Sequence, residues 1–213
     1  MATVINFGVP QLSGGGSDSP ILMPKLAYRF RVTLLNFGGL AATSTLTSQV
    51  VSVTKPNLTH EEITVDVYNS KIYLAGKHTW DPITLVVKDD ISGAVDRAIA
   101  AQLQRQLNHA AQSAPVAGAN YKFAMRIEAL DGGNNVNINQ GDVPVVLDEW
   151  DLAGCFLQNV QYGENNYATS DVVNITMQIR YDNADHFVNG ASQLQRPAVR
   201  ATGLGTASAN GSN

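Results

Sequence analysis

Apolar and polar side chains alternate with a period of two along most of the chain. In the stretch 26–37, Phe30 and Val32 fall on one face. Arg31 and Thr33 fall on the other. This alternation is typical of half-buried β-strands, because successive side chains of a strand point to opposite faces of its sheet. The same reasoning predicts further strands at 45–53, 63–68, 83–87, 121–129, 143–147, 152–162 and 172–181.

One segment departs from this rhythm. From Ile91 to about His109, apolar residues recur four positions apart, which is the period of an amphipathic helix. Asp90 and Ser92 precede this pattern in the place of a helix cap, and Arg105 lies near its negative end. One long helix between groups of strands predicts an α+β fold that is mostly β.

The two ends of the chain differ from its middle. Gly and Ser dominate 13–20, and Gly, Ala, Ser, Thr and Asn dominate the stretch after about residue 190. Such segments gain little from burial and lose much conformational entropy when ordered. We therefore expect a flexible N-terminal arm at 1–24, a folded domain at 25–187 and a flexible C-terminal extension at 188–213.

Composition and charge exclude several classes of protein. Charged residues make up 15% of the 213 residues and the net charge is −4, so no basic surface for gripping nucleic acid is expected. A single cysteine excludes a disulfide framework. No apolar run reaches the roughly 18 residues of a membrane span, and the N-terminus lacks a secretory signal pattern. The sequence favours folding in a reducing cytoplasm and contact with other protein.

Charge is unevenly distributed. The stretch 131–185 is strongly acidic, whereas Lys25, Arg29 and Arg31 make the start of the predicted domain basic. Opposite charges at the two ends of a chain would steer head-to-tail association. Ordinary solvated faces explain the same pattern, and the sequence leaves both explanations open.

No motif indicates catalysis. The four histidines lie in no spacing typical of metal ligands, and neither a nucleophile elbow nor a phosphate-binding loop is present. The acidic cluster 148–151 would suit glycoside hydrolysis or calcium binding, but Asp148 and Glu149 are neighbours in a strand and would point to opposite faces. We expect no catalytic residue, no metal site and no cofactor.

The segment 53–90 contains the most informative pattern. A clean strand at 63–68 is followed by a stretch too apolar for a solvent-exposed loop, which predicts a projecting hairpin whose aromatic side chains contact a partner. Trp80 fits either this contact or the core of its own subunit. The candidate inter-subunit residues are Asn69, Lys71, Tyr73, Leu74, Lys77, His78 and Trp80.

This segment resembles the tail tube proteins of contractile-tailed, T-even-like bacteriophages (myoviruses). The resemblance is strongest over 45–110 and weaker through the later strands. The residues that carry it are Pro56, Asn69, Lys71, Ile72, Leu74, Ala75, Gly76, Lys77, Thr79, Trp80, Asp81, Leu85, Val87 and Asp90.

The resemblance implies a fold and a function. The fold would be two packed antiparallel sheets, a sandwich or distorted barrel, flanked by one α-helix. Six copies would form a ring, rings would stack into a tube inside a sheath, and baseplate and tail terminator proteins would meet its ends. Such a virion protein would be assembled in the host cytoplasm, would not enter a membrane, and would guide DNA ejection without catalysis.

A tube that passes DNA should offer phosphate no adhesive basic groups, which fits the low Lys and Arg content. Asp66 and Glu128, on the polar faces of their strands, are candidates for the lumen. Two alternatives remain: the inner tube of a phage-like bacteriocin or type VI secretion apparatus, and a monomeric β-sandwich that binds a ligand near 148–151.

Overall fold

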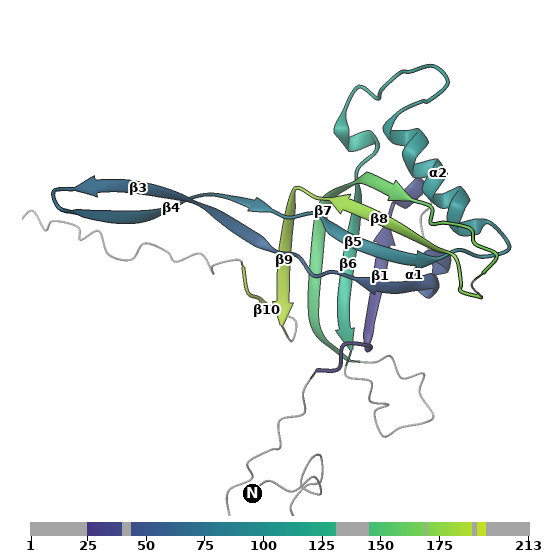
Figure 1. The fold of residues 1–213 in the computed structure, drawn as a ribbon, viewed down its shortest axis with the longest axis horizontal. Coiled ribbons are helices and arrows are strands. Elements are labelled where there is room, and N and C mark those ends of the chain that lie inside the picture. The colour runs from purple at the N-terminus through teal and green to yellow at the C-terminus, as the bar shows by residue number, and fades with distance from the viewer. Residues whose placement is uncertain (1–24, 40–43, 131–144, 169, 189–190, 195–213) are drawn as a thin grey trace, which may run out of the picture.

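The computed structural model describes residues 25–39, 44–130, 145–168, 170–188 and 191–194. Antiparallel strands dominate it, with one long helix to the side (Figure 1). In chain order the elements are β1 Phe30–Leu35, η2 Phe37–Gly39, α1 Ser44–Gln49, β2 Val50–Val53, β3 Leu58–Val67, β4 Ser70–Trp80, β5 Ile83–Lys88, α2 Ala94–Gln106, η3 Gly118–Asn120, β6 Phe123–Leu130, β7 Val146–Gln161, β8 Asn174–Arg180, β9 Asn183–Val188 and β10 Ala191–Ser192.

Strand β7 is shared by two sheets. Its first part pairs with β6 and β9, and its second part pairs with β8, so the strand order runs β1-β6-β7-β8-β5-β2. We call β1, β6, β9, β10 and the first part of β7 the first sheet, and the second part of β7 with β8, β5 and β2 the second sheet. The expected mostly β, two-sheet fold is confirmed; the sheets do not close into a barrel.

The change of sheet occurs near Gly154, where the backbone has a φ of 70°. A side chain there would be strained, and a Cβ would lie 2.1 Å from the Asp182 carboxylate. Glycine at this position lets β7 turn from one sheet into the other.

The core lies between the two sheets and under α2. Alternate residues of β1 and β6 are buried, such as Val32, Leu34, Met125 and Ile127. Every other residue of β5 and β8 is buried as well, as the period-two pattern predicts. Helix α2 adds Val95 and Ile99, so the amphipathic interpretation of this segment is confirmed.

The helix is shorter than the sequence suggested. It begins after Gly93, which has a φ of 63°, and Leu107 is already extended. Ile91 is fully exposed and lies outside the helix. The Asp90 carboxylate accepts hydrogen bonds from the Ala94 and Val95 amides, as expected of a cap.

Three strand predictions need correction. The stretch 45–53 is not one strand: α1 fills its first half and buries Leu46, because core packing overrides β-propensity there. The predicted strands 143–147 and 152–162 are joined, from Val146 onward, in the single strand β7. Strands β9 and β10 were not predicted; β9 pairs with the first part of β7.

Gln102 ties the helix to its surroundings. Its side chain is fully buried; its Oε1 accepts from the Gly38 amide at 2.9 Å, and its Nε2 donates to the Tyr121 carbonyl at 2.6 Å. We expect Gln102→Ala to lower the free energy of unfolding by about 2 kcal/mol, because both partners lose a buried hydrogen bond. Urea unfolding measures this, and Gln104→Ala on the exposed side of α2 should change it far less.

Candidate assembly surfaces

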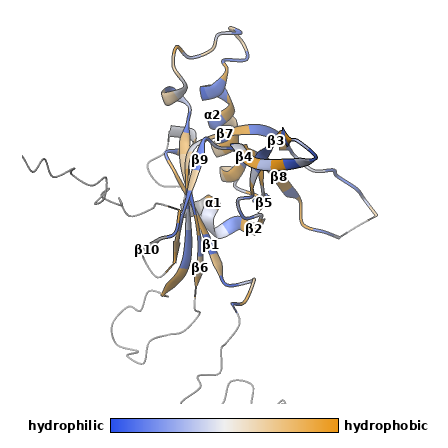
Figure 2. Cartoon of the chain, turned by 90° about the vertical axis from the view of Figure 1, so that its left-hand side faces the viewer, coloured by the Kyte–Doolittle hydropathy of each residue, from blue (hydrophilic) through white to orange (hydrophobic). Residues whose placement is uncertain are grey.

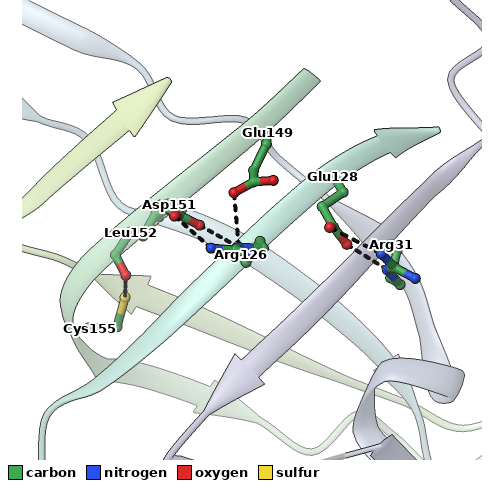
Figure 3. A network of polar contacts seen from close by, with 7 residues as sticks. All are labelled: Arg31, Arg126, Glu128, Glu149, Asp151, Leu152 and Cys155. Carbon is green, nitrogen blue, oxygen red and sulfur yellow. Dashed lines mark hydrogen bonds and ion pairs between the residues drawn. The ribbon is translucent and has the colours of Figure 1, made fainter. Parts of the chain in front are cut away.

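The first sheet carries a row of paired charges on the side that faces away from the core. Figure 3 shows this charged face, which we define as Arg31, Arg126, Glu128, Glu149 and Asp151. Strand register places these side chains next to one another: Arg31 lies opposite Glu128, and Arg126 lies opposite Asp151.

Each guanidinium group of the charged face is held by carboxylates. Arg31 Nε and Nη2 donate to the two Glu128 carboxylate oxygens at 2.5 and 3.1 Å. Arg126 binds both Asp151 oxygens at 2.7 and 2.9 Å and contacts Glu149 at 3.1 Å. The hydrogen bonds raise the pKa of both guanidinium groups despite partial burial. The surface is therefore acidic in balance, and its cations are engaged by fixed anions.

The two predicted lumen residues lie in different places. Glu128 is almost fully buried within the charged face. Asp66 lies on β3, where its side chain is 80% exposed and 3.9 Å from the Lys71 ammonium group. The structure therefore does not bring these two carboxylates together.

Asp148 lies on the other side of the first sheet from Glu149. It accepts a hydrogen bond from His186 and forms ion pairs with Lys55 at 3.3 Å and Lys25 at 3.4 Å. The expectation that Asp148 and Glu149 point to opposite faces is confirmed. No group of three His, Cys, Asp or Glu side chains in the described ranges is arranged to hold a metal ion.

These contacts make stability depend on pH. Burial would raise the pKa of the Asp148 carboxyl, but the hydrogen bond from His186 and the charges of Lys55 and Lys25 hold it below its ordinary value of 3.8. A lowered pKa in the folded state stabilises the protein above the unfolded-state pKa, and this stabilisation is lost as the pH falls through the folded-state value.

We therefore expect Asp148→Asn to reduce the free energy of unfolding at pH 7 by about 1–3 kcal/mol. The loss should shrink as the pH falls below the ordinary carboxyl pKa of 3.8 and through the lowered folded-state pKa, because the wild-type carboxyl then becomes neutral. Urea unfolding across this pH range measures the effect. An equal loss at every pH would show that the Asp148 charge does not contribute.

The hairpin of β3 and β4 forms a separate two-stranded sheet that projects from the body (Figure 1). Its predicted inter-subunit residues from Asn69 to His78 are all exposed. Figure 2, seen from the hairpin side, shows apolar and polar residues interspersed along it. Cross-strand register collects the apolar side chains on one side, the apolar hairpin face: Ile63, Val65, Val67, Ile72 and Leu74, each 41–52% exposed.

Trp80 lies at the base of this hairpin and is buried, with 7% of its surface exposed. Its ring packs on Tyr181, with the ring centroids 5.8 Å apart. Of the two possibilities that the sequence left open, this placement favours the core of the subunit.

The edges of the two sheets are a further candidate surface. In the described part of the chain, β1 pairs only with β6, and β2 pairs only with β5. An exposed edge strand presents unpaired backbone groups that another chain can pair with.

None of the described helices has the length and apolar character needed to cross a membrane.

No protein-family model matches the sequence, and no curated protein sequence matches it significantly. Solved structures do match. A chain of the anti-feeding prophage (AFP) tube-terminating cap has a TM-score of 0.58 and 15% identity, covering 81% of this chain and 96% of that chain. A chain of the six-fold symmetrised AFP baseplate has a TM-score of 0.52 and 14% identity, with coverages of 80% and 99%.

A third match comes from the sheath–tube complex of PVC, an extracellular contractile injection system, in its extended state. Its TM-score is 0.52 at 13% identity, and the coverages are 78% and 92%. The chain has a tail-tube-like fold of contractile injection systems. These neighbours are chains of a baseplate, a tube-terminating cap and a sheath–tube complex.

Proposed function

We propose that this chain is the tube subunit of a contractile bacteriophage tail, and that six copies form a ring that stacks into a hollow tube. The observation that carries the proposal is the apolar hairpin face, which projects into solvent from a subunit with a tail-tube-like fold. Exposed apolar surface of this kind marks a site of protein contact. A neighbouring copy would cover it.

Within the ring, β1 of one copy would lie beside β9 and β10 of the next. Joining these edges would continue the first sheet around the ring and remove its exposed edges. Contacts between rings would be head to tail, which does not close and therefore produces a filament. The sheath would surround this tube, and baseplate and terminator proteins would occupy its ends.

The charged face would line the lumen of this tube, with Glu128 in it. Asp66 lies on the projecting hairpin, so it would reach the lumen only if the hairpin packs against a neighbouring copy in a way that turns Asp66 inward. Because Arg31 and Arg126 are already bound to carboxylates, phosphate groups of passing DNA would find few available cations. DNA could then slide through without being held.

This mechanism predicts a gain of DNA binding when the anions are removed. Tubes that carry Glu128→Gln and Asp151→Asn should bind duplex DNA at low salt on the order of tenfold more tightly, because Arg31 loses its carboxylate partner and Arg126 keeps only Glu149. Filter binding at several salt concentrations measures this. Glu61→Gln with Glu62→Gln changes the net charge equally but lies on the hairpin, at exposed positions of β3, so it should have little effect.

Assembly is the direct test of the proposal. The full chain, purified and concentrated, should form six-fold rings or stacked tubes in negative-stain electron microscopy. A stable monomer at high concentration, with no rings and with a bound sugar or other small ligand, would overturn the proposal in favour of a ligand-binding module.

The tube of a phage-like injection machine is a second candidate, favoured by the likeness to chains of AFP and PVC assemblies. Both candidates share the same subunit physics and differ in what surrounds the tube. Particles isolated from the producing bacterium distinguish them, because a phage tail is joined to a DNA-filled head and an injection machine is not. In either case assembly would take place in the bacterial cytoplasm.

A further inference from the structure

A cleft of about 670 Å³ opens between the two sheets, and its apolar side chains from β6 and β7 alternate along these strands with those of the charged face. Its walls come from residues 25–29, the start of β1, strand β2 and parts of β6 and β7. The side chains that make it apolar are Phe30, Val51, Val53, Ile127 and Trp150. A volume of this size suits several apolar side chains of a bound segment.

The Asp148 carboxylate at the cleft is paired with charged partners of its own subunit. Asp148 lines the cleft and is bound by His186, Lys25 and Lys55, and Glu128, which also lines it, is bound by Arg31. A ligand that enters the cleft therefore needs no charge of its own. Beside the cleft runs β2, which has β5 as its neighbour on one side and is the last strand in the order of the second sheet. An extended segment can add to such an edge and place alternate side chains in an adjoining pocket.

The chain itself supplies a segment with these properties. From Thr3 to Val9 it places Ile5, Phe7 and Val9 on one face of an extended strand. Between residues 2 and 17 there is no charged side chain, which matches the apolar cleft.

The position at which the chain enters the cleft supports an intramolecular origin. Lys25 and the two residues after it line the cleft, so the described part of the chain starts at its edge. The 15 residues from 10 to 24 span up to about 50 Å when extended, which is enough to return past the cleft. Gly14–Gly16 would allow that reversal of direction.

We propose that residues 3–9 bind in this cleft as a strand added to β2 of the same subunit, with Ile5 and Phe7 inserted between the sheets. The segment would cover the edge of β2 and fill the gap at this end of the core. This role is separate from ring formation and goes beyond the proposed tube function.

Cysteine cross-linking tests the proposal on the full chain. Phe7→Cys is combined with Val51→Cys in the cleft and treated with a short bismaleimide. The native Cys155 is buried, and desolvation raises the pKa of its thiol to about 12, so it will not compete. The matched control pairs Phe7→Cys with Gln158→Cys, an exposed position outside the cleft.

We expect a cross-link at the mass of one chain that forms about tenfold faster for Val51→Cys than for the control, because binding raises the effective concentration. Equal rates would overturn the proposal. A product at the mass of two chains would also overturn it, because the occupant would then be a second copy.

A second measurement does not depend on Phe7→Cys. The alkylation rate of Val51→Cys in the full chain should rise severalfold when Phe7→Ser is added or when residues 1–12 are removed. An unchanged rate would contradict the proposal. Both measurements use the monomeric fraction, so they test the binding of residues 3–9 without assembly. Failure of the proposed tube function would instead appear as the absence of rings in electron micrographs. The two proposals can therefore fail independently.

Discussion

Replacing residues 61–77 by Asn-Gly should abolish ring and tube formation and leave the body of the subunit folded. The replacement joins the paired residues His60 and His78 by a turn typical of two-residue hairpins. Because β3 and β4 form a sheet separate from the eight-stranded one, their outer part adds little to the core. Electron microscopy should show no rings, and dilute samples should unfold within about 0.5 kcal/mol of the wild type.

Single substitutions separate the apolar hairpin face from the hairpin as a whole. Ile72→Lys lies on that face and should weaken assembly strongly, because a charge would be buried against the neighbouring copy. Thr64→Lys lies on the opposite side of the same hairpin and should weaken it much less. Equal assembly by both variants, measured by sedimentation, would show that the apolar hairpin face is not an interface.

Trp80→Ala should lower the free energy of unfolding by about 3–5 kcal/mol, because it leaves a large cavity against Tyr181. Urea unfolding of dilute protein measures the effect without a contribution from assembly. Because the variant is less stable, fewer folded subunits would be present, and less tube would form for that reason.

The matched control is Tyr73→Ala, at the exposed end of the same strand. Tyr73 is 62% exposed, so its removal should change the free energy of unfolding by less than about 0.5 kcal/mol. If Tyr73 contacts a neighbouring copy, the same variant should still assemble poorly. A stable Trp80→Ala subunit that fails to assemble would instead place Trp80 in an interface.

Elements that bury only one of their faces could be predicted from the sequence alone. The strands at 83–87, 121–129 and 172–181 were predicted because one face of each is buried and the other is polar, which produces a clean period of two. The helix was predictable because it too buries one face. Its start was predicted too early, because Gly93 precedes the helix in a left-handed conformation, and hydrophobic periodicity carries no information about backbone conformation. The stretch 45–53 was misread because α1 has Thr and Leu in a pattern compatible with either structure.

The candidate surfaces could be predicted only in part. The hairpin was visible as an apolar stretch bounded by strands, but its one-sided apolar face depends on the register between β3 and β4. The charged face was missed for a similar reason: Arg31 and Glu128 are distant in sequence, and only strand pairing brings them together. Strand β9 was not predicted because its composition is polar. Its place in the sheet depends on pairing with β7 and not on a hydrophobic pattern of its own.

The continuity of β7 has a mechanical consequence. A force applied to the second sheet passes along one covalent backbone into the first sheet, without crossing a loop. On the side of the second sheet, the pairing of β7 with β8 is the ladder that holds β8, β5 and β2 to this strand. In the proposed tube, the subunit should therefore pass a push from one sheet to the other along this strand as a stiff unit.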